Sequence, residues 1–292
     1  MTQQRSLLDL DARGRVLTLG RETRIMGILN CTPDSFSADG LLRSAKGKIN
    51  TAACLRYAGK LVDQGADIID IGGESSRPGA LSVPLEEEIR RVVPVAGILA
   101  RKLKVPISVD TSKLDVARRC LDAGVSIINN IRAGRAAAGF LRMVRDYGAS
   151  IVIMHMRGSP ATMQSMARYR DVVNEVIAEL KISVEKCLEI GIKKGRIIVD
   201  PGIGFAKTAE QNLELINHLD RLNVLRLPIL LGTSRKSFIG KVLRHDAAGR
   251  LMGTAATVTA GVLRGAHIVR VHDVKEIKET LKITDAILNA RS

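Results

Sequence analysis

The chain has 292 residues, of which 46% are hydrophobic, and its 45 Lys and Arg residues against 30 Asp and Glu residues give a formal net charge of +15. This length suits two average domains or a single α/β barrel, and the aliphatic content is enough for a large core. No run reaches the roughly 18 apolar residues of a membrane span, charges occupy the N-terminal region where a signal peptide would be apolar, and the four cysteines have neither metal-ligand nor disulfide-framework spacing, so we expect a cytoplasmic protein.

The positive charge favours anionic partners: nucleic acid, an anionic membrane surface or phosphorylated small molecules. Lys and Arg are scattered through helix-like segments such as residues 100–104, without a basic tail, a basic block or interleaved aromatic residues. Specific nucleic-acid binding calls for a clustered patch and a motif. We therefore expect small-molecule substrates and neither nucleic acid nor a membrane as a partner.

Short β-branched runs alternate with segments of helical periodicity along the chain. The predicted strands are residues 25–29, 67–71, 105–109, 125–128, 150–154, 196–199, 227–231 and 266–271. The predicted helices are residues 48–64, 85–103, 113–122, 136–147, 171–190, 210–221, 236–243, 250–264 and 275–289. This alternation predicts right-handed βαβ units around a parallel sheet.

Eight such units predict an α/β fold, a single (β/α)₈ TIM barrel over residues 24–292. Residues 1–23 are predicted to be an extension that packs on the barrel. A doubly wound open sheet is the alternative, but it would usually have fewer strands, and the chain has no early Gly-x-Gly-x-x-Gly motif.

Each predicted strand ends in polar or ionisable residues, which a barrel brings together at one face. These positions are Asn30, residues 72–78, residues 110–113, residues 129–130, residues 155–157, residues 200–202, residues 232–236 and residues 270–273. Taken singly, Asp110 or Ser234 could cap a helix and Asn129 could lie in a turn. His155 could be a packed histidine, and Arg270 a solvated charge. Eight such positions on one face indicate a ligand site.

The residue types divide this face into two sets. The first set offers hydrogen-bond acceptors, an amide and a cation, which suit a planar heterocycle. Its members are Asp110, Asn129, Asp200 and Lys236. Cationic groups suit phosphate oxygens, and this set is Arg77, Arg270 and His272. Asn30 and the hydroxyls that follow it could hold hydrated Mg²⁺, which needs few protein ligands. The sequence offers neither a dense Asp/Glu cluster nor a Ser-His-Asp or Cys-His pattern.

A long ordered series of motifs resembles the dihydropteroate synthase family from Arg24 nearly to the C-terminus. The motifs are MGILNCTPDSFSADG, DIGGESSRPGA, ISVDTSK, IINN, IMHMRGSPATMQ, IIVDPGIGFAKTAEQNL, LLGTSRKSFIG, GTAATV and IVRVHDV. The resemblance implies a (β/α)₈ barrel, a homodimer formed through helices late in the chain, and a transferase reaction of folate biosynthesis. That reaction joins p-aminobenzoate to a hydroxymethyl-dihydropterin diphosphate with the aid of Mg²⁺, and sulfonamides mimic p-aminobenzoate.

Carried over position by position, the resemblance assigns roles to individual residues. Those that hold the pterin are Asp110, Asn129, Asp200 and Lys236, and Asp110, Asp200 and Lys236 are also expected to act in catalysis. Those that bind the diphosphate are Asn30, Arg270 and His272, and Asn30 also reaches the metal. Those on the p-aminobenzoate side are Ser76, Arg77 and Ser234. Two loops, residues 31–40 and 74–81, are expected to close over the substrates.

Several positions depart from the family pattern. Residues 37–40 read SADG where SDGG is common, and residues 131–139 read IRAGRAAAG, unlike the usual continuation. Ser76 replaces Thr, Asn130 replaces Asp, and Arg157 replaces Gln. None of these changes removes a residue assigned to pterin or phosphate, so the expected function stands, whereas a response to sulfonamides does not follow from the sequence.

Three other functions compete with the synthase. A pterin-binding methyltransferase barrel would recognise a folate but expel no diphosphate, and the cationic residues at 235–236 and 270–272 argue against it. A non-catalytic pterin-binding paralogue is supported only by the altered first loop and Asn130. A basic nucleic-acid-binding protein is supported by net charge alone.

Overall fold

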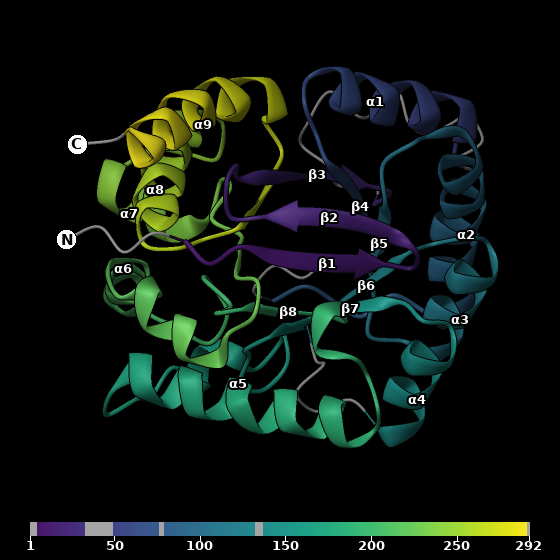
Figure 1. Cartoon of the computed structure of the whole chain (residues 1–292), viewed down its shortest axis with the longest axis horizontal. Coiled ribbons are helices and arrows are strands. Elements are labelled where there is room, and N and C mark those ends of the chain that lie inside the picture. Colours follow the sequence, from purple (N-terminus) through teal and green to yellow (C-terminus); the bar gives the residue numbers. More distant parts are fainter. Residues whose placement is uncertain (1–4, 33–48, 76–78, 132–136, 291–292) are drawn as a thin grey trace.

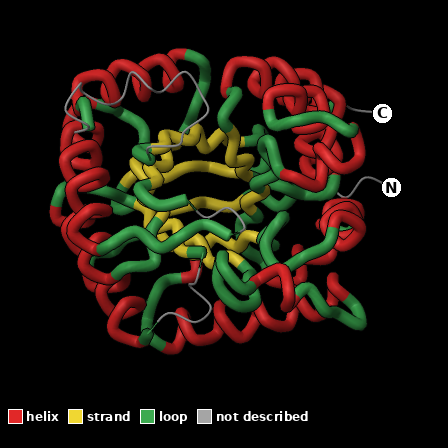
Figure 2. The backbone as a smooth tube through the Cα atoms, turned by 180° about the vertical axis from the view of Figure 1, so that it is seen from behind, coloured by secondary structure: helices red, strands yellow, loops and turns green. Residues whose placement is uncertain are grey.

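The computed structural model describes residues 5–32, 49–75, 79–131 and 137–290, and it contains the predicted barrel. Eight parallel strands run in the order β8-β7-β6-β5-β4-β3-β10-β9. They are β3 (Arg24–Asn30), β4 (Ile68–Gly72), β5 (Ile107–Asp110), β6 (Ile127–Asn130), β7 (Ser150–Met154), β8 (Ile197–Asp200), β9 (Leu230–Leu231) and β10 (Ile268–Val271). A parallel bridge between Val199 and Ile229 joins β8 to β9 and closes the ring that Figure 2 shows. The TIM-barrel prediction is confirmed.

Helices surround this ring (Figure 1); every strand of the ring is followed by a helix, and the strand β9 is followed by two, α7 and α8, as the sequence predicts. They are α1 (Thr51–Asp63), α2 (Leu85–Lys102), α3 (Leu114–Asp122), α4 (Ala138–Asp146), α5 (Val172–Glu189), α6 (Ala209–Asn217), α7 (Ser237–Leu243), α8 (Leu251–Leu263) and α9 (Val274–Asn289). Short 3₁₀ turns lie at Met163–Met166, Lys194–Arg196, Leu219–Leu225 and Ala248–Arg250. The helix predicted over residues 210–221 is shorter, because α6 ends at Asn217 and a 3₁₀ turn follows. No helix within the described ranges is long and apolar enough to cross a membrane.

The two largest apolar clusters among the described residues lie on opposite faces of the strands, because successive side chains point to opposite faces of a sheet. The outward residues of the strands, such as Ile69 on β4, pack with the helices in the larger cluster. The inward residues form a smaller cluster inside the barrel, made by Met26, Ile68, Ile127, Val152, Ile198, Leu230 and Ile268. This inner layer fills the barrel near the amino ends of its strands, so the space for a ligand lies at the carboxyl ends.

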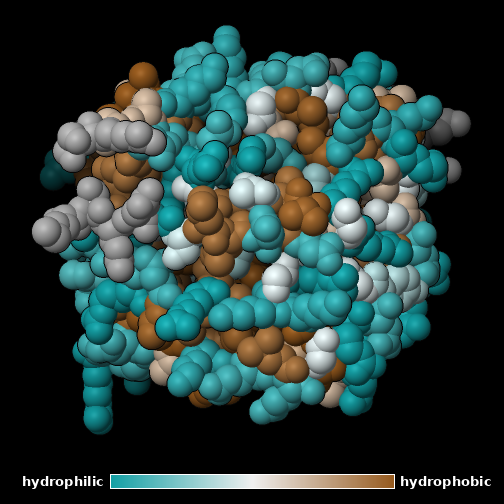
Figure 3. Space-filling view, in the orientation of Figure 1, coloured by the Kyte–Doolittle hydropathy of each residue, from teal (hydrophilic) through white to brown (hydrophobic). Residues whose placement is uncertain are grey.

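An antiparallel hairpin covers the amino ends of the barrel strands. Its strands, β1 (Leu8–Ala12) and β2 (Arg15–Leu19), are joined by Arg13 and Gly14, whose φ values of 57° and 85° match the mirror-image turn favoured in two-residue hairpins. Leu10 and Leu19 are fully buried in the inner cluster. Figure 1 shows the hairpin across the barrel, and on the face seen in Figure 3 hydrophilic residues surround scattered apolar ones. The sequence predicts an extension at residues 1–23 but not its two strands.

Candidate active site

The polar residues of the barrel interior form a layer directly above the inner apolar cluster. On β4, Asp70 lies two positions after Ile68 and therefore faces inward with it. The same step of two leads from Ile127 to Asn129, from Ile198 to Asp200 and from Ile268 to Arg270. Two carboxylates, an amide and a guanidinium thus come from four different strands. Side chains alternate between the inside and the outside along each strand, and this alternation, rather than any loop, determines how deep the four groups lie in the barrel.

A pocket of about 490 Å³ opens above this layer, a volume in the ordinary range for small-molecule sites. Its lining includes every sequence-predicted site residue that the structure describes, namely Asn30, Asp110, Asn129, Asp200, Ser234, Lys236, Arg270 and His272. The other two predicted residues, Ser76 and Arg77, lie outside the described residues, as do most positions of the two loops expected to close over the substrates. The structure therefore gathers one site from residues that span most of the chain.

Arg270 lies at the centre of the site between two carboxylates. Its Nε donates to Asp70 Oδ2 at 2.6 Å, and a terminal nitrogen donates to Asp110 Oδ2 at 3.2 Å. The Asn129 amide nitrogen donates to the same Asp70 oxygen at 3.1 Å. Arg270 is therefore a paired and largely buried cation, so the alternative of a solvated charge is wrong.

The environment shifts the pKa values of Asp110 and Lys236 toward neutrality. Burial, together with the negative charges of Asp70 and Glu88, raises the pKa of Asp110 to about 7 against the opposing attraction of Arg270. Burial lowers the pKa of Lys236 to about 8, although the charge of Asp200 favours its ammonium. Groups of opposite charge whose pKa values lie this close to 7 are typical of active sites.

Asp200 is fixed by the backbone that follows it. Burial raises the pKa of its carboxyl, while the N–H of Gly202 donates to Oδ1 at 2.7 Å and partly offsets that effect. Gly202 has a φ of 69°, and a Cβ there would lie 1.9 Å from the carbonyl oxygen of His155. Glycine is thus required for the tight turn that orients the carboxylate.

The loop after β8 supplies an apolar wall that the sequence analysis misses. Ile203 and Phe205 line the pocket with Met154 and Ile131. The Lys236 ammonium lies 4.0 Å from the centre of the Phe205 ring, a distance at which a cation is attracted to an aromatic face. A flat apolar surface beside hydrogen-bonding groups fits a planar heteroaromatic ring. The glycines around residues 202–204 are the sequence signal for this close approach.

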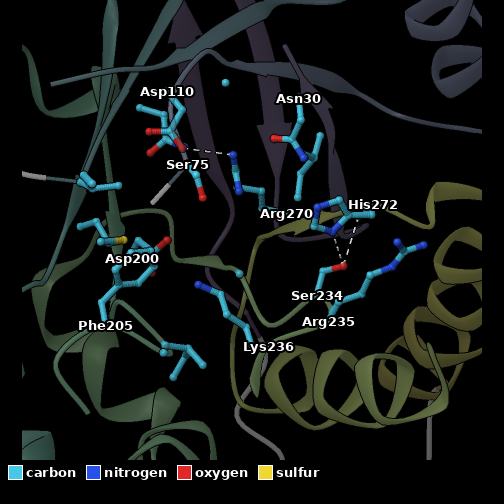
Figure 4. A pocket seen from close by; sticks show the side chains of 18 of the residues that line it. Asn30, Ser75, Asp110, Asp200, Phe205, Ser234, Arg235, Lys236, Arg270 and His272 are labelled. Carbon is cyan, nitrogen blue, oxygen red and sulfur yellow. Dashed lines mark hydrogen bonds and ion pairs between the residues drawn. The ribbon is translucent and has the colours of Figure 1, made fainter. Parts of the chain in front are cut away.

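The opposite side of the pocket is made by residues from β3, β10 and the loop after β9. Ser234 Oγ and His272 Nδ1 lie 3.0 Å apart, and the His272 backbone N–H donates to the same hydroxyl at 3.2 Å. In Figure 4, Asn30, Ser234 and His272 lie on one side and Asp110 and Asp200 on the other, with Arg270 and Lys236 between them. The pocket therefore has an acidic half, rich in acceptors, and a half with imidazole, hydroxyl and amide groups.

Three structural alternatives from the sequence are excluded by the bounds of the helices and strands. The residues at the N-caps of α3 and α7 are Lys113 and Lys236, so neither Asp110 nor Ser234 caps a helix. Asn129 belongs to β6 and not to a turn. Ser234 Oγ instead accepts a hydrogen bond from the backbone N–H of His272.

His155 is a packed histidine, as its structural interpretation predicts. It is buried, its Nε2 lies 3.1 Å from Glu179 Oε2, and its Nδ1 lies 3.0 Å from Lys207 Nζ. Burial lowers the pKa of His155 to about 4, so the neutral ring can accept a hydrogen bond from the lysine. Arg157, one of the departures from the family pattern, pairs with Glu175 and Glu179 beside this histidine, and its role here is structural.

Two buried charged residues with evident roles escape the sequence analysis. Lys207 donates to the carbonyls of Gly202 and Phe205 at 3.1 and 3.0 Å and so braces the loop behind the pocket. Asp70 holds Arg270 and Asn129 but does not itself line the pocket. Two features of the sequence could have indicated them: a lysine inside the IIVDPGIGFAKT motif and a charged residue within the apolar strand IIDIG.

The donor set suits a metal only in part. No group of three or more His, Cys, Asp or Glu residues in the described ranges could hold an ion alone. Asn30 offers an amide oxygen at the end of β3, and a Cβ at Gly72 would lie 3.4 Å from that oxygen, so the glycine keeps the space beside it open. This arrangement fits Mg²⁺ if most of its ligands come from water and a bound phosphate.

Comparison with known proteins agrees with this geometry. Residues 26–272 match the family described as pterin binding enzyme. The dihydropteroate synthase of Synechocystis is 44% identical over 269 residues, which cover 92% of this chain and 91% of the relative.

Two solved structures are similar to this chain along almost its whole length. The Yersinia pestis dihydropteroate synthase in complex with a sulfonamide drug has a TM-score of 0.89 and 40% identity, with 97% of this chain and 100% of that chain covered. The Clostridium difficile dihydropteroate synthase in the presence of pteroic acid has a TM-score of 0.83 and 44% identity, with 92% and 98% covered. The chain belongs to the pterin binding enzymes and, among them, to the dihydropteroate synthase family.

Proposed function

We propose that the pocket carries out the reaction of this family through the residues gathered at its mouth and floor. The substrates are the diphosphate of 6-hydroxymethyl-7,8-dihydropterin and p-aminobenzoate, and the products are 7,8-dihydropteroate and diphosphate. The observation that carries the assignment is the division of one pocket into an acidic, acceptor-rich half and a half suited to anions, with Arg270 between them.

The acidic half is proposed to hold the pterin. A pterin edge combines N–H donors with ring-nitrogen and carbonyl acceptors. Asp110 and Asp200 accept, the Asn129 carbonyl oxygen accepts while its NH₂ group donates to Asp70, and Lys236 donates. The ring would lie beside Phe205 and Met154, whose side chains line the same pocket. A buried site of this kind discriminates strongly against a ligand that leaves its polar groups unpaired.

The other half is proposed to hold the diphosphate. Arg270 and His272 supply donors to its oxygens, and the Asn30 amide oxygen would take part in binding Mg²⁺ together with phosphate oxygens. When bound, Mg²⁺ would draw negative charge from the departing diphosphate. The Arg270 guanidinium lies close enough to Asp110 to serve both halves.

The chemistry needs no covalent enzyme intermediate. The bond between the pterin methylene and the diphosphate oxygen breaks, and its electron pair leaves with the diphosphate. The carboxylates of Asp110 and Asp200 provide a fixed negative field for the positive charge that develops on the methylene. The p-aminobenzoate nitrogen then forms the new C–N bond and releases a proton.

The p-aminobenzoate side is proposed to include Ser234, with Ser76 and Arg77 from the loop after β4. Ser234 lines the pocket next to Lys236 and His272. The Yersinia pestis relative has been solved with a sulfonamide drug, so we propose that sulfonamides compete with p-aminobenzoate at this position in the present chain.

The chain is further proposed to work as a cytoplasmic homodimer. Helix α8 has the sequence LMGTAATVTAGVL, without a charged residue, and Met252 on its outer side is 76% exposed. On the adjacent α9, Ile283 and Ile287 are 66% and 64% exposed. A helix that is apolar on both sides suits burial between two subunits.

A coupled product assay tests the reaction. Pterin diphosphate, p-aminobenzoate and Mg²⁺ are incubated with the protein, and diphosphate release and dihydropteroate formation are followed together. We expect equal amounts of the two products and no reaction when Mg²⁺ is chelated. Absence of dihydropteroate at any Mg²⁺ concentration would rule the function out.

A further inference from the structure

Asp70 is a fully buried carboxylate in the middle of an apolar strand, and it contacts two residues of the pocket without lining the pocket itself. The strand reads Ile-Ile-Asp-Ile-Gly, and all five residues are buried. Arg270 Nε and Asn129 Nδ2 both donate to Asp70 Oδ2, at 2.6 and 3.1 Å. One oxygen atom on β4 therefore tethers a side chain of β6 and a side chain of β10.

The chemistry of the carboxylate fixes the direction of the Asn129 amide. An ionised carboxylate only accepts hydrogen bonds, whereas an amide has a donating end and an accepting end. Asn129 must therefore turn its NH₂ group toward Asp70, which leaves its carbonyl oxygen for the ligand. An asparagine without this partner could present either end.

The same contact limits the Arg270 guanidinium. With Nε held by Asp70 and a terminal nitrogen directed at Asp110, the plane of the guanidinium is fixed at two points. Because guanidinium donors lie in a rigid fork, fixing two of them also directs the others. The orientation is set before a ligand arrives.

Stability alone is a poor explanation for this residue. Asp70 Oδ1 and the Oγ of Ser108, its register partner on β5, are buried and have no hydrogen-bond partner among the described residues. Leaving a buried polar atom unpaired is unfavourable, and packed apolar residues often replace such groups without loss. A costly residue that contacts two ligand-facing side chains is typical of a site organised for function.

We propose that Asp70 is a positioning residue for the heterocycle: it orients Asn129 and Arg270 so that the Asn129 carbonyl oxygen meets an N–H donor of the ligand. The proposal rests on the proposed function for the identity of the heterocycle. It adds a residue that acts through two others and never touches the substrate.

The test compares Asp70→Asn with Asp67→Asn. Asp67 precedes the same strand and also accepts from an arginine and a backbone N–H, at 3.0 and 2.9 Å, but far from the pocket. For Asp70→Asn we expect the KM for pterin diphosphate to rise on the order of 10- to 100-fold, by analogy with the loss that follows removal of the hydrogen-bond partner of a metal ligand. The KM for p-aminobenzoate should change less than about threefold, within the scatter of a neutral substitution. Asp67→Asn should change only the melting temperature.

A double-mutant cycle separates positioning from general destabilisation. Binding of 6-hydroxymethylpterin, which lacks the diphosphate, is measured by calorimetry for Asp70→Asn, Asn129→Ala and the double variant. If Asp70 acts through Asn129, the loss caused by Asp70→Asn shrinks in the Asn129→Ala background. Additive losses, or equal increases in both KM values, would overturn the proposal.

A failure to fold and a failure of the proposed function can both be told apart from a failure of the Asp70 proposal. If Asp70→Asn does not fold, Asp70→Ser is used in the same cycle, because serine fits the space and also removes the acceptor-only group. If the wild-type protein binds the pterin but makes no dihydropteroate, the proposed function fails while the cycle still decides the role of Asp70.

Discussion

At the level of single residues, Asp110 and Lys236 set the expected pH dependence. The pKa of Asp110 is raised to about 7 by burial, so its carboxylate forms as the pH rises through 7. The pKa of Lys236 is lowered to about 8 by burial, so its ammonium is lost above that pH. If the reaction needs both the Asp110 carboxylate and the Lys236 ammonium, kcat/KM rises as the pH passes the pKa of Asp110 and falls as the pH passes the pKa of Lys236.

We therefore expect a bell-shaped profile of kcat/KM for pterin diphosphate, with its maximum between the two values. Asp110→Asn should abolish the acidic limb and lower kcat on the order of 10²-fold, as removal of a single electrostatic group does in other enzymes. Lys236→Arg should move the alkaline limb beyond the measured range, because arginine stays protonated. A profile that is unchanged in both variants would remove these residues from the essential ionisations.

Arg270 gives a second prediction at this scale. Arg270→Ala removes a donor to the diphosphate, and hydrogen bonds to charged groups contribute about 1.5–3 kcal/mol each. Binding of pterin diphosphate should therefore weaken on the order of 10-fold or more beyond any loss for 6-hydroxymethylpterin. Titration calorimetry with the two ligands makes the comparison within one variant. Equal losses for both ligands would show that Arg270 does not bind the diphosphate.

At the level of elements, the hairpin and the barrel mouth serve different purposes. Leu10 on β1 is fully buried against the inner apolar layer at the amino ends of the strands. In TIM barrels this end contributes stability, whereas the opposite end carries the chemistry. Substitutions in the hairpin should therefore affect folding and spare the reaction.

Leu10→Ala tests this division. Truncation of a buried leucine costs about 2–5 kcal/mol, so the denaturant midpoint should fall clearly while both KM values at low temperature stay unchanged. Val16→Ala is the matched control, because Val16 lies in the same hairpin and is 61% exposed. A rise in either KM would show that the hairpin also shapes the pocket.

The elements themselves were largely predictable from the sequence, for a physical reason. A parallel strand buried on both faces is a continuous β-branched run, and the helices between such runs are amphipathic. The hairpin was missed although LDLDARGRVLTL alternates apolar and polar residues on both sides of Arg13-Gly14. Its apolar face is narrow, and the contact of this face with the barrel interior is not visible in the local sequence.

The pocket was predictable where its residues lie at or next to the ends of strands, and not where they lie in the middle. Asp110 and Asp200 close apolar runs and Arg270 lies one residue before the end of β10, so their gathering follows from the barrel. Asp70 interrupts a run, and its contacts with Asn129 and Arg270 join positions 59 and 200 residues apart. Such pairings depend on how three strands approach one another, which local patterns do not encode.

At the level of the whole molecule, the exposed apolar side of α8 and α9 predicts self-association. Ile283→Glu would place a charge in the proposed subunit interface, where an unpaired charge is strongly unfavourable. We expect the wild type to sediment as a dimer and this variant as a monomer. Ile182→Glu is the matched control on α5, because Ile182 and Ile283 are both 66% exposed. A monomeric wild type would contradict the dimer.

The hairpin determines from which end of the barrel the substrates reach the pocket. Because β1 and β2 cover one end of the barrel and apolar side chains fill its interior above them, the pocket opens at the other end. Asn129 and Asp200, two of the four proposed pterin contacts, are 5% and 7% exposed and lie at the bottom of the pocket. We therefore expect the pterin to enter before the arylamine, and the finished product to leave before a new pterin enters. Dihydropteroate should accordingly inhibit as a competitor of pterin diphosphate.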